Sequence, residues 1–528
     1  MGKTEQREAL SQTFAYQTRP WLTPEEDLIL GAYGELYSRV ERNLFAEVIK
    51  GGSAAKLKSQ MMAEFKLSAR QYNAIAIGLR GKISAIKERR GGLIQEAETR
   101  IAKAQKTIVK LAKKAPGSNR LHQKKRRLTT LQARLLSMKQ DHKQGKVRLC
   151  FGSKKLFRSQ FYLEENGYNS LSEWRQDWQT ARGSQFFVIG SKDESGGCQG
   201  CVAAKQPDGS LSLRLRLPDA IAKAGKYLTL EGLQFAYGQA EIEAALANGI
   251  AISYRFVRDQ KGWRVMVSLS VKAPQLNSKR SLGALGVDVN GNHLAVSEVD
   301  RFGNYTGGQK IACLTYGKSE DQTKAQVGEA VKQVIQLALQ AGKPVVIEKL
   351  DFGQKKAEME GSDPSRARQL SAFAYSQVSK AMHSAGFKQG VEIIEVNPAF
   401  TSIIGAVNYS QKLGISIHQG AALAIARRGM GLSESLTVRT ANVPVRNGGH
   451  VTFLLPVRNR RKHVWSFWSQ TARRLKAAQR VQVRSGKAKA NPAPLSRQSL
   501  GEVWALSVKS RQVNRLHNGS VGVMDDLV

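Results

Sequence analysis

The spacing of apolar residues changes along the chain, and each spacing predicts a different kind of structure. Isoleucines recur every seven residues over 94–108, and leucines do the same over 121–135. The segment APGSN at 115–119 separates the two runs. This pattern predicts an antiparallel pair of helices that share an apolar seam. Helical spacing as a whole extends from residue 23 to about residue 145.

The segment before these helices is typical of a strand that leads into a helix. Residues 13–22 read as a short strand, and Thr23-Pro24-Glu25-Glu26 follows directly. A threonine cap, a proline at the first helical position and acids in the first turn are typical of a helix N-terminus. We therefore expect the first helix to begin at this point.

Short alternating strands replace the helical pattern from 146 to 280. KVRLCFGS at 146–153 reads as the first of them, and SLRLRL at 212–217 alternates polar and apolar residues with period two. RDQKG at 258–262 separates two β-rich runs, as a hairpin turn does. The pattern predicts a β-rich domain with a barrel-like form.

Residues 281–435 alternate between strand and helix patterns, which indicates an α/β domain. A strand at 285–288 ends in Asp288, and Asn290-Gly291-Asn292 is typical of a hairpin turn leading to a returning strand at 293–299. A second apolar strand delivers Glu348 at its end. GVEIIEV at 390–396 reads as a third strand, with a helix expected near 416–431.

Acidic residues at the ends of neighbouring strands suggest a metal site. A buried aspartate is costly unless it is paired or bound to a metal. Two carboxylates and a third ligand from the following helix would suit Mg²⁺ or Mn²⁺. Two such ions can activate a water and stabilise the leaving oxygen of a phosphodiester. The spacing alone leaves a second interpretation open, because acids end strands by chance in many α/β domains.

Four segments resemble the motifs of RuvC-type nuclease domains in TnpB proteins and type V CRISPR effectors. GVDVNGNHLAVSEVDRFGN is similar to the first motif and VVIEKLDF to the second. VNPAFTSIIG resembles the segment that leads to a zinc ribbon, and HQGAALAIARR resembles the third motif. The resemblance covers most of residues 13–435. It implies an RNase H-like fold and RNA-guided cleavage of DNA.

Carried over residue by residue, the resemblance makes Asp288 and Glu348 the first two catalytic metal ligands. His418 stands where the family has a third aspartate. Imidazole can bind Mn²⁺ and is tolerated near Mg²⁺, but it removes one negative charge from the site. The alternative interpretation of His418 is an ordinary core or surface histidine. Glu434 is a weaker substitute for the third acid. Asp300 and Asp351 are interpreted as turn residues outside the site.

The cysteines of a zinc ribbon are absent from the expected place. The chain has four cysteines, and its one C-x-x-C pair is Cys198 and Cys201 in the β-rich region. A single pair without a second pair or a nearby histidine is poor support for a tetrahedral site, so zinc is not expected. So few cysteines in 528 residues also argue against a disulfide framework and favour a reducing compartment.

The net charge points to a polyanionic partner. The chain carries 82 Lys and Arg against 42 Asp and Glu, a net charge of +40. A membrane surface is the rival partner, but no apolar run approaches the ~18 residues of a spanning helix, and no secretory signal is recognised. We expect a prokaryotic cytoplasmic, nucleoid-associated protein. Guide RNA and double-stranded target DNA are the partners that the resemblance implies. The candidate phosphate-binding residues are Lys124, Lys125, Arg126, Arg127, Lys154, Lys155, Arg427 and Arg428.

The predicted fold class is multidomain α+β, with a helical recognition lobe, a β-barrel-like wedge domain and an RNase H-like nuclease domain. The expected segments are a wedge strand (1–22), the helical lobe (23–145), the β-rich wedge (146–280), the RuvC-like domain (281–435) and a basic, partly flexible C-terminal region (436–528).

The first functional hypothesis is an RNA-guided, metal-dependent DNA endonuclease that uses a two-metal-ion mechanism. The alternative is an RNA-guided DNA-binding protein with a weakened or inactive site that acts by target occupancy. A transposase with the same fold ranks below both, because no separate end-recognition domain is seen. The sequence leaves the guide RNA, the target-adjacent motif, the oligomeric state, and the choice between transposon and CRISPR context open.

Overall fold

The chain forms two compact units in the computed structural model. The first comprises 1–277, 315–331 and 350–392, and the second comprises 278–314, 332–349 and 393–528. The residues that the structure describes are 11–192, 194–223, 225–349, 375–434, 439–444 and 449–489. Asp351 and residues 490–528 of the predicted C-terminal region (436–528) lie outside them. None of the described helices is both long and apolar enough to span a membrane.

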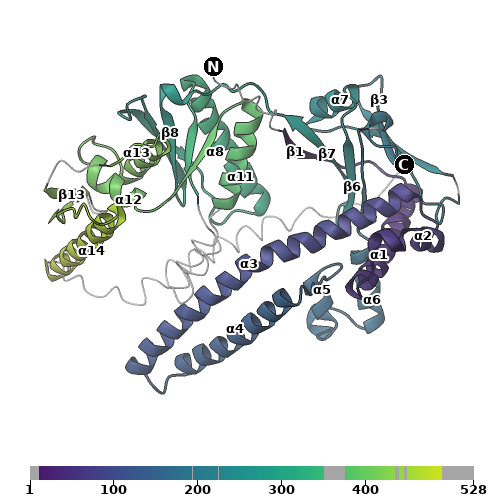
Figure 1. The fold of residues 1–528 in the computed structure, drawn as a ribbon, viewed down its shortest axis with the longest axis horizontal. Coiled ribbons are helices and arrows are strands. Elements are labelled where there is room, and N and C mark those ends of the chain that lie inside the picture. Colours follow the sequence, from purple (N-terminus) through teal and green to yellow (C-terminus); the bar gives the residue numbers. More distant parts are fainter. Residues whose placement is uncertain are drawn as a thin grey trace, which may run out of the picture. The chain divides into compact units, whose positions relative to one another are not determined.

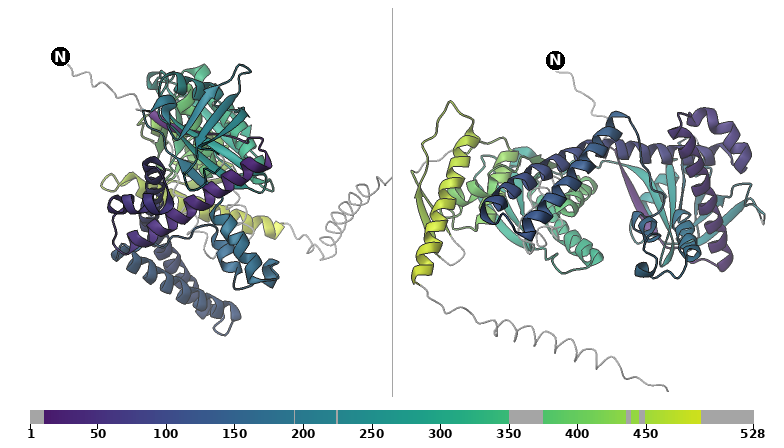
Figure 2. Two further views of the ribbon diagram at one scale, coloured as in Figure 1. Left: turned by 90° about the vertical axis from the view of Figure 1, so that its right-hand side faces the viewer. Right: turned by 90° about the horizontal axis from the view of Figure 1, so that it is seen from below.

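The helical part of the first unit follows the predicted pattern closely. Its helices are α1 (Pro24–Ile49), α2 (Ala54–Phe65), α3 (Ala69–Lys114) and α4 (Asn119–Lys143). The predicted cap at Thr23 is confirmed, because its side chain accepts from the backbone of Glu26 in a capping box. The predicted break at 115–119 is also confirmed: α3 and α4 lie side by side as a hairpin (Figures 1 and 2).

Two antiparallel sheets make up the β-rich part of the first unit. One has the order β1 (Ser11–Thr18), β7 (Gly262–Lys272), β6 (Ile252–Asp259), β2 (Gln185–Val188). The other has the order β3 (Cys201–Lys205), β4 (Leu211–Arg216), β5 (Tyr227–Leu233), and α7 (Gln239–Ala247) follows it in the chain. The predicted hairpin at 258–262 joins β6 to β7. Mixed α and β structure is thus confirmed, whereas closure into a barrel stays a prediction.

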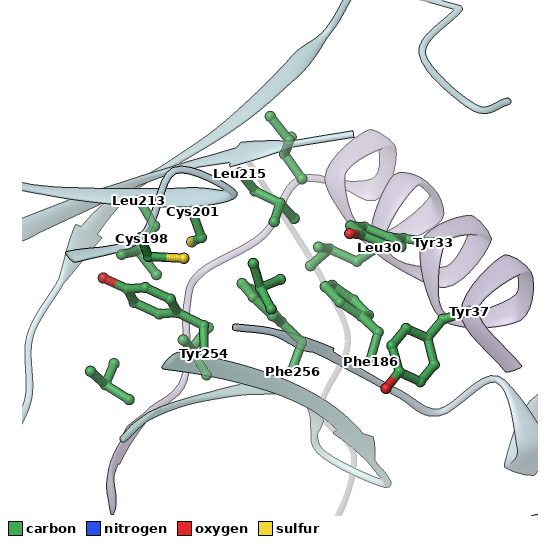
Figure 3. Close-up of a cluster of buried hydrophobic side chains, with 14 of the residues drawn as sticks. Leu30, Tyr33, Tyr37, Phe186, Cys198, Cys201, Leu213, Leu215, Tyr254 and Phe256 are labelled. Atoms are coloured by element: carbon green, nitrogen blue, oxygen red, sulfur yellow. The ribbon is translucent and has the colours of Figure 1, made fainter. Parts of the chain in front are cut away.

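One hydrophobic core joins both sheets to the helices of this unit. Phe186 stacks on Tyr33 of α1 with 4.2 Å between ring centroids, and on Phe256 with 4.6 Å. Leu213 and Leu215 come from the alternating segment SLRLRL, and both are buried in this cluster (Figure 3). The period-two pattern therefore supplies the apolar face of β4.

The expectation of strands throughout 146–280 is wrong for its first part. Residues 146–153 contain no strand, and two helices follow them: α5 (Lys154–Ser159) and α6 (Leu171–Arg182). Ser153 and Ser170 cap these helices with their side chains. Helix N-caps favour serine because its hydroxyl accepts from a free backbone N–H, and this local signal prevailed over the β-like composition.

The second unit is built on a five-stranded mixed sheet. Its order is β10 (Tyr305–Ala312), β9 (His293–Val299), β8 (Ala284–Val289), β11 (Val345–Glu348), β12 (Ile393–Val396). β8, β9 and β10 pair antiparallel, whereas β8, β11 and β12 pair parallel. Helix α8 (Glu320–Ala341), whose residues divide between the two units, precedes β11 in the chain, and α11 (Tyr375–Gln389), which belongs to the first unit, precedes β12. The predicted hairpin and both apolar strands are confirmed, and β10 is an addition.

The remaining elements of the second unit follow β12. They are α12 (Thr401–Ile404), η4 (Gly405–Tyr409), α13 (Ile417–Gly429), β13 (Thr440–Pro444), β14 (His450–Leu454) and α14 (Val464–Lys489). Phe467 and Trp468 of α14 pack against Ile404 and against Ala424 of α13. The part of the C-terminal region that the structure describes is thus folded onto the unit that contains the five-stranded sheet.

Candidate active site

Helix α13 lies directly against the backbone of the sheet (Figure 1). A Cβ atom added to Gly286 of β8 would lie 1.9 Å from the carbonyl oxygen of Ala422 and 2.6 Å from the backbone nitrogen of Ala426. A Cβ atom at Gly429 would lie 2.5 Å from a methyl group of Val346 on β11. α13 therefore covers the face of the sheet toward which Gly286 and Val346 point.

The two predicted carboxylates lie on this same face. Side chains alternate along a strand, so Asp288 points the same way as Gly286, and Glu348 the same way as Val346. Strands β8 and β11 are parallel, and Ile347 is paired with Val287. Asp288 and Glu348 are the next residues along each strand. The register thus places the two acids side by side at the carboxyl ends of adjacent strands.

Asp288 is buried and has two side-chain partners. It is 8% exposed. Its Oδ2 atom accepts from Nδ2 of Asn290 at 2.9 Å and lies 3.2 Å from Nδ1 of His418. A capping box between Ser416 and Gln419 fixes the start of α13, so His418 falls in its first turn. The predicted contact between the first strand and this helix is therefore present, over 130 residues of separation.

A second histidine supports this arrangement, and the sequence analysis did not identify it. His293 begins β9 and is buried. Its Nδ1 lies 2.6 Å from Oδ1 of Asn292, and its ring meets the His418 ring edge-on, with 5.2 Å between centroids. Burial lowers the pKa of His293, and the neighbouring Lys310 and His418 act in the same direction. His293 thus restricts the position of the His418 ring.

Glu348 is held by Thr401, which the sequence analysis also missed. The Thr401 hydroxyl lies 2.5 Å from Oε1 of Glu348 and 3.1 Å from the carbonyl oxygen of Pro398. Thr401 is fully buried, and Phe400 before it has a positive φ of 63°. Non-glycine residues avoid this conformation, and exceptions cluster at functional sites. The strained turn after β12 therefore presents Thr401 to the second carboxylate.

Replacing Thr401 with valine is expected to weaken binding of Mn²⁺ by about 10–100-fold, because partners that orient a metal ligand have effects of this size on metal affinity. The measurement is the dissociation constant of Mn²⁺. Thr471→Val is the matched control, since Thr471 is equally buried but bonds to Phe467 within α14. Equal affinities for wild type and Thr401→Val would show that Thr401 does not orient Glu348 for metal binding.

The two arginines predicted on α13 are engaged within the protein. Arg427 forms an ion pair with Glu434 at 3.0 Å and donates to the carbonyl of Gly303 at 2.6 Å. Tyr409 also donates to Glu434. Glu434 thus belongs to a separate network, which disfavours it as a third ligand. Arg428 donates to the backbone of the turn after β12, and burial lowers the pKa of its guanidinium.

The other candidate residues lie in the first unit. Lys124, Lys125, Arg126 and Arg127 are on α4, and Lys154 and Lys155 begin α5. All but Lys124 are exposed. Their role in phosphate binding stays a prediction. Asp300 accepts from the backbone of Phe302 and Asn304, as its interpretation as a turn residue requires, and these hydrogen bonds lower the pKa of its carboxyl.

The C-x-x-C pair lies in the core of the first unit. Cys198 and Cys201 are fully buried near Tyr254 (Figure 3). Burial raises the pKa of both thiols, which disfavours the thiolate that binds metal. Within the described ranges, no three His, Cys, Asp or Glu side chains group as a metal site. Asp288 and His418 are in contact, and Glu348 lies beside Asp288 on the neighbouring strand.

Comparison with known proteins gives matches at the level of structure. No family model and no curated protein matches the chain. A Cas12f1–sgRNA–target DNA complex is 12% identical with a TM-score of 0.33, over 79% of this chain and 99% of that one. RuvC of T. thermophilus with a Holliday junction substrate is 18% identical with a TM-score of 0.20, over 29% of this chain and 99% of that one.

A second type V effector gives a similar result. A Cas12i1 R-loop complex before target DNA cleavage is 9% identical with a TM-score of 0.29, over 66% of this chain and 61% of that one. These proteins are of the kind that the motifs around Asp288 and Glu348 resemble. Each of these TM-scores is below 0.5.

Proposed function

We propose that the second unit is a RuvC-type nuclease domain and that the chain is an RNA-guided DNA endonuclease. The observation that carries this proposal is the placement of Asp288 and Glu348. They stand side by side at the ends of parallel strands, and His418 in the first turn of α13 contacts Asp288. A buried aspartate at such a place is costly unless it serves a cation or a partner.

The donor atoms of the site fit a divalent cation. Asp288 and Glu348 supply carboxylate oxygens and His418 an imidazole nitrogen, a set that suits Mn²⁺ at least as well as Mg²⁺. Bound divalent ions in nucleases activate the attacking water and stabilise the leaving oxygen. Asn290 holds the first carboxylate and Thr401 the second. These contacts would keep both ligands oriented while the substrate binds.

The charge of the chain supports nucleic-acid partners. A net charge of +40 favours binding of phosphate backbones without regard to sequence. In an RNA-guided protein, pairing with the guide reads the sequence and the protein supplies cations and shape. Guide RNA and double-stranded target DNA are the partners that we propose on this basis.

A second candidate function is binding of the target without cleavage. The observation that favours it is His418 itself, which contributes no negative charge and has Nδ1 within 3.2 Å of Asp288. A site with two carboxylates attracts divalent cations less strongly than a site with three. In this second function, the protein would act by occupying its target.

Replacing His418 with aspartate separates the two functions. The complex is reconstituted with the RNA that co-purifies, and cleavage of a matched DNA target is followed in Mg²⁺ and in Mn²⁺. We expect slow cleavage by wild type and a gain of about tenfold or more for His418→Asp, within the range of metal-site perturbations. His142→Asp, an exposed histidine on α4, is the control for the change in charge.

The outcomes are distinct. Cleavage by wild type supports the endonuclease. Tight guided binding by a wild type that does not cleave, with cleavage by His418→Asp, supports target occupancy. If no defined RNA co-purifies, both functions fail. If both proteins bind tightly and neither cleaves, the site has lost more than its third acid and the endonuclease is excluded.

A further inference from the structure

Helices α5 and α6, which follow α4 and precede β2 in the sequence, carry a small cluster of aromatic side chains. Trp174 and Trp178 of α6 stack with 5.8 Å between ring centroids, and Phe157 of α5 packs on Trp178 at 5.6 Å. The indole N–H of Trp174 donates to the carbonyl of Leu156 at 2.7 Å. These contacts fix α5 on α6, so the side chains on the other face of α5 stand on a rigid support.

Residues of α5 and of the segment that follows it form a hollow, which we call the α5 hollow. Its volume is about 360 Å³, within the range of about 300–1,000 Å³ that is usual for ligand sites. The residues that line it are Lys154, Lys155, Arg158, Ser159, Tyr162 and Asn166. Three of these six side chains are cationic and none is acidic. The hollow therefore has the charge of an anion-binding site.

The described acidic residues do not neutralise the cations that line the α5 hollow. Lys154, Lys155 and Arg158 are exposed, and none of them forms an ion pair with any residue that the structure describes. Arg427, by contrast, is paired with Glu434. Three unpaired cations around one hollow repel each other, and an anionic ligand would relieve this repulsion.

Exposed aromatic rings stand beside these cations. Tyr162, which lines the hollow, is 59% exposed, and the adjacent Phe161 is 67% exposed. Proteins that bind single strands combine backbone-neutralising cations with aromatic rings on which bases stack. A duplex cannot use such a ring in the same way, because its bases are already stacked. The combination therefore favours an unpaired strand over a duplex.

We propose that the α5 hollow binds one nucleotide of an unpaired nucleic-acid strand. Lys154, Lys155 and Arg158 contact its phosphate, and its base stacks on Tyr162. The hollow lies within the first unit and does not involve Asp288 or Glu348. The proposal therefore stands independently of the nuclease function and adds a site that distinguishes unpaired from paired strands.

The test uses the full chain, freed of co-purifying RNA, in EDTA so that no cleavage occurs. Fluorescence anisotropy measures binding of labelled oligouridine RNA, oligothymidine DNA and a DNA duplex. Tyr162→Ala is expected to weaken single-strand binding by about fivefold or more while duplex binding is unchanged. Tyr162→Phe keeps the ring and should bind like wild type. Tyr237→Ala, an 83% exposed tyrosine elsewhere in the same unit, is the matched control.

Two further measurements locate the site. A photoreactive oligonucleotide carrying 4-thiouridine should crosslink to the peptide that contains Tyr162. Changing Lys154, Lys155 and Arg158 together to glutamine should reduce the salt dependence of single-strand binding, since fewer counterions are released. Circular dichroism checks that each variant is folded, which is expected because the four changed side chains are exposed.

The outcomes show whether the α5 hollow binds an unpaired strand and whether that strand is RNA. Tighter, Tyr162-dependent binding of RNA than of DNA identifies an RNA strand, and equal binding identifies any unpaired strand. Unchanged binding by Tyr162→Ala, with crosslinks elsewhere, overturns the proposal. An equal loss for duplex and single strand also overturns it, because it indicates a simple charge patch. Binding to anionic lipid vesicles is measured in the same way. If Tyr162→Ala weakens binding to the vesicles but not to any oligonucleotide, the α5 hollow binds a membrane surface instead.

Discussion

Replacing Asp288 with asparagine is expected to reduce metal-dependent cleavage by more than about 100-fold, because even indirect partners of a metal ligand account for 10–100-fold. Asparagine keeps the size of the side chain and an acceptor for Asn290 but removes the charge that a cation needs. Guided binding of target DNA should not change, since none of the candidate phosphate-binding cations is altered. The measurements are the cleavage rate in Mn²⁺ and the dissociation constant of the complex.

Asp300→Asn is the matched control for this prediction. Asp300 is in the same unit, but its carboxyl accepts from the backbone of the turn at 300–304, and asparagine can preserve these contacts. It should cleave like wild type. Full cleavage by Asp288→Asn would place the reaction elsewhere in the molecule. A joint loss of binding and cleavage would mean that Asp288 stabilises the fold rather than the reaction.

Replacing Gly286 with alanine is expected to destabilise the second unit by about 3 kcal/mol, the upper end of the usual cost of overpacking. The added methyl group would meet the carbonyl oxygen of Ala422 at 1.9 Å and the nitrogen of Ala426 at 2.6 Å. Both are backbone atoms and cannot rotate away, so α13 must move off the sheet. Hydrogen exchange of the amides in β8 and α13 measures this loss of stability locally. A local measurement is needed because a chain of two units has no single free energy of unfolding.

Gly307→Ala on β10 is the control for the change at Gly286. A Cβ atom at Gly307 would have no atom within 4 Å, although the residue belongs to the same sheet. It should leave exchange in β8 and α13 unchanged. If the amides of β8 and α13 are equally protected from hydrogen exchange in Gly286→Ala and in Gly307→Ala, α13 tolerates a shift of its backbone. Because His418 is carried by α13, Gly286→Ala should also separate His418 from Asp288.

The elements near the site could be predicted from local sequence rules. The Asn-Gly turn after Asp288 indicated the hairpin of β8 and β9, and the apolar run before Glu348 indicated β11. The helix expected near 416–431 is confirmed as α13. These elements depend on residues that are close together in the sequence, so the spacing of apolar and turn residues predicts them.

The failures came where neighbours in space decide the outcome. Residues 154–182 read as part of a β-rich domain, yet capping serines and the packing of Phe157, Trp174 and Trp178 make them helical. The hydrogen bonds of Arg428 to backbone carbonyls of its own chain were also not foreseen, and its contact with phosphate stays a prediction. Neither outcome follows from spacing, because each depends on a partner that the sequence does not place.

By itself the sequence predicted that Asp288 and Glu348 lie at strand ends and that His418 lies in a helix, since the alternation and spacing of apolar residues are local properties. Only the tertiary structure decided their partners. Asp288 meets His418 across 130 residues, and Glu348 meets Thr401 across 53. The parallel register sets the two acids side by side, and the close crossing at Gly286 carries His418 to the first of them. Hydrogen bonding between distant segments requires their final packing, and that packing is a property of the whole unit.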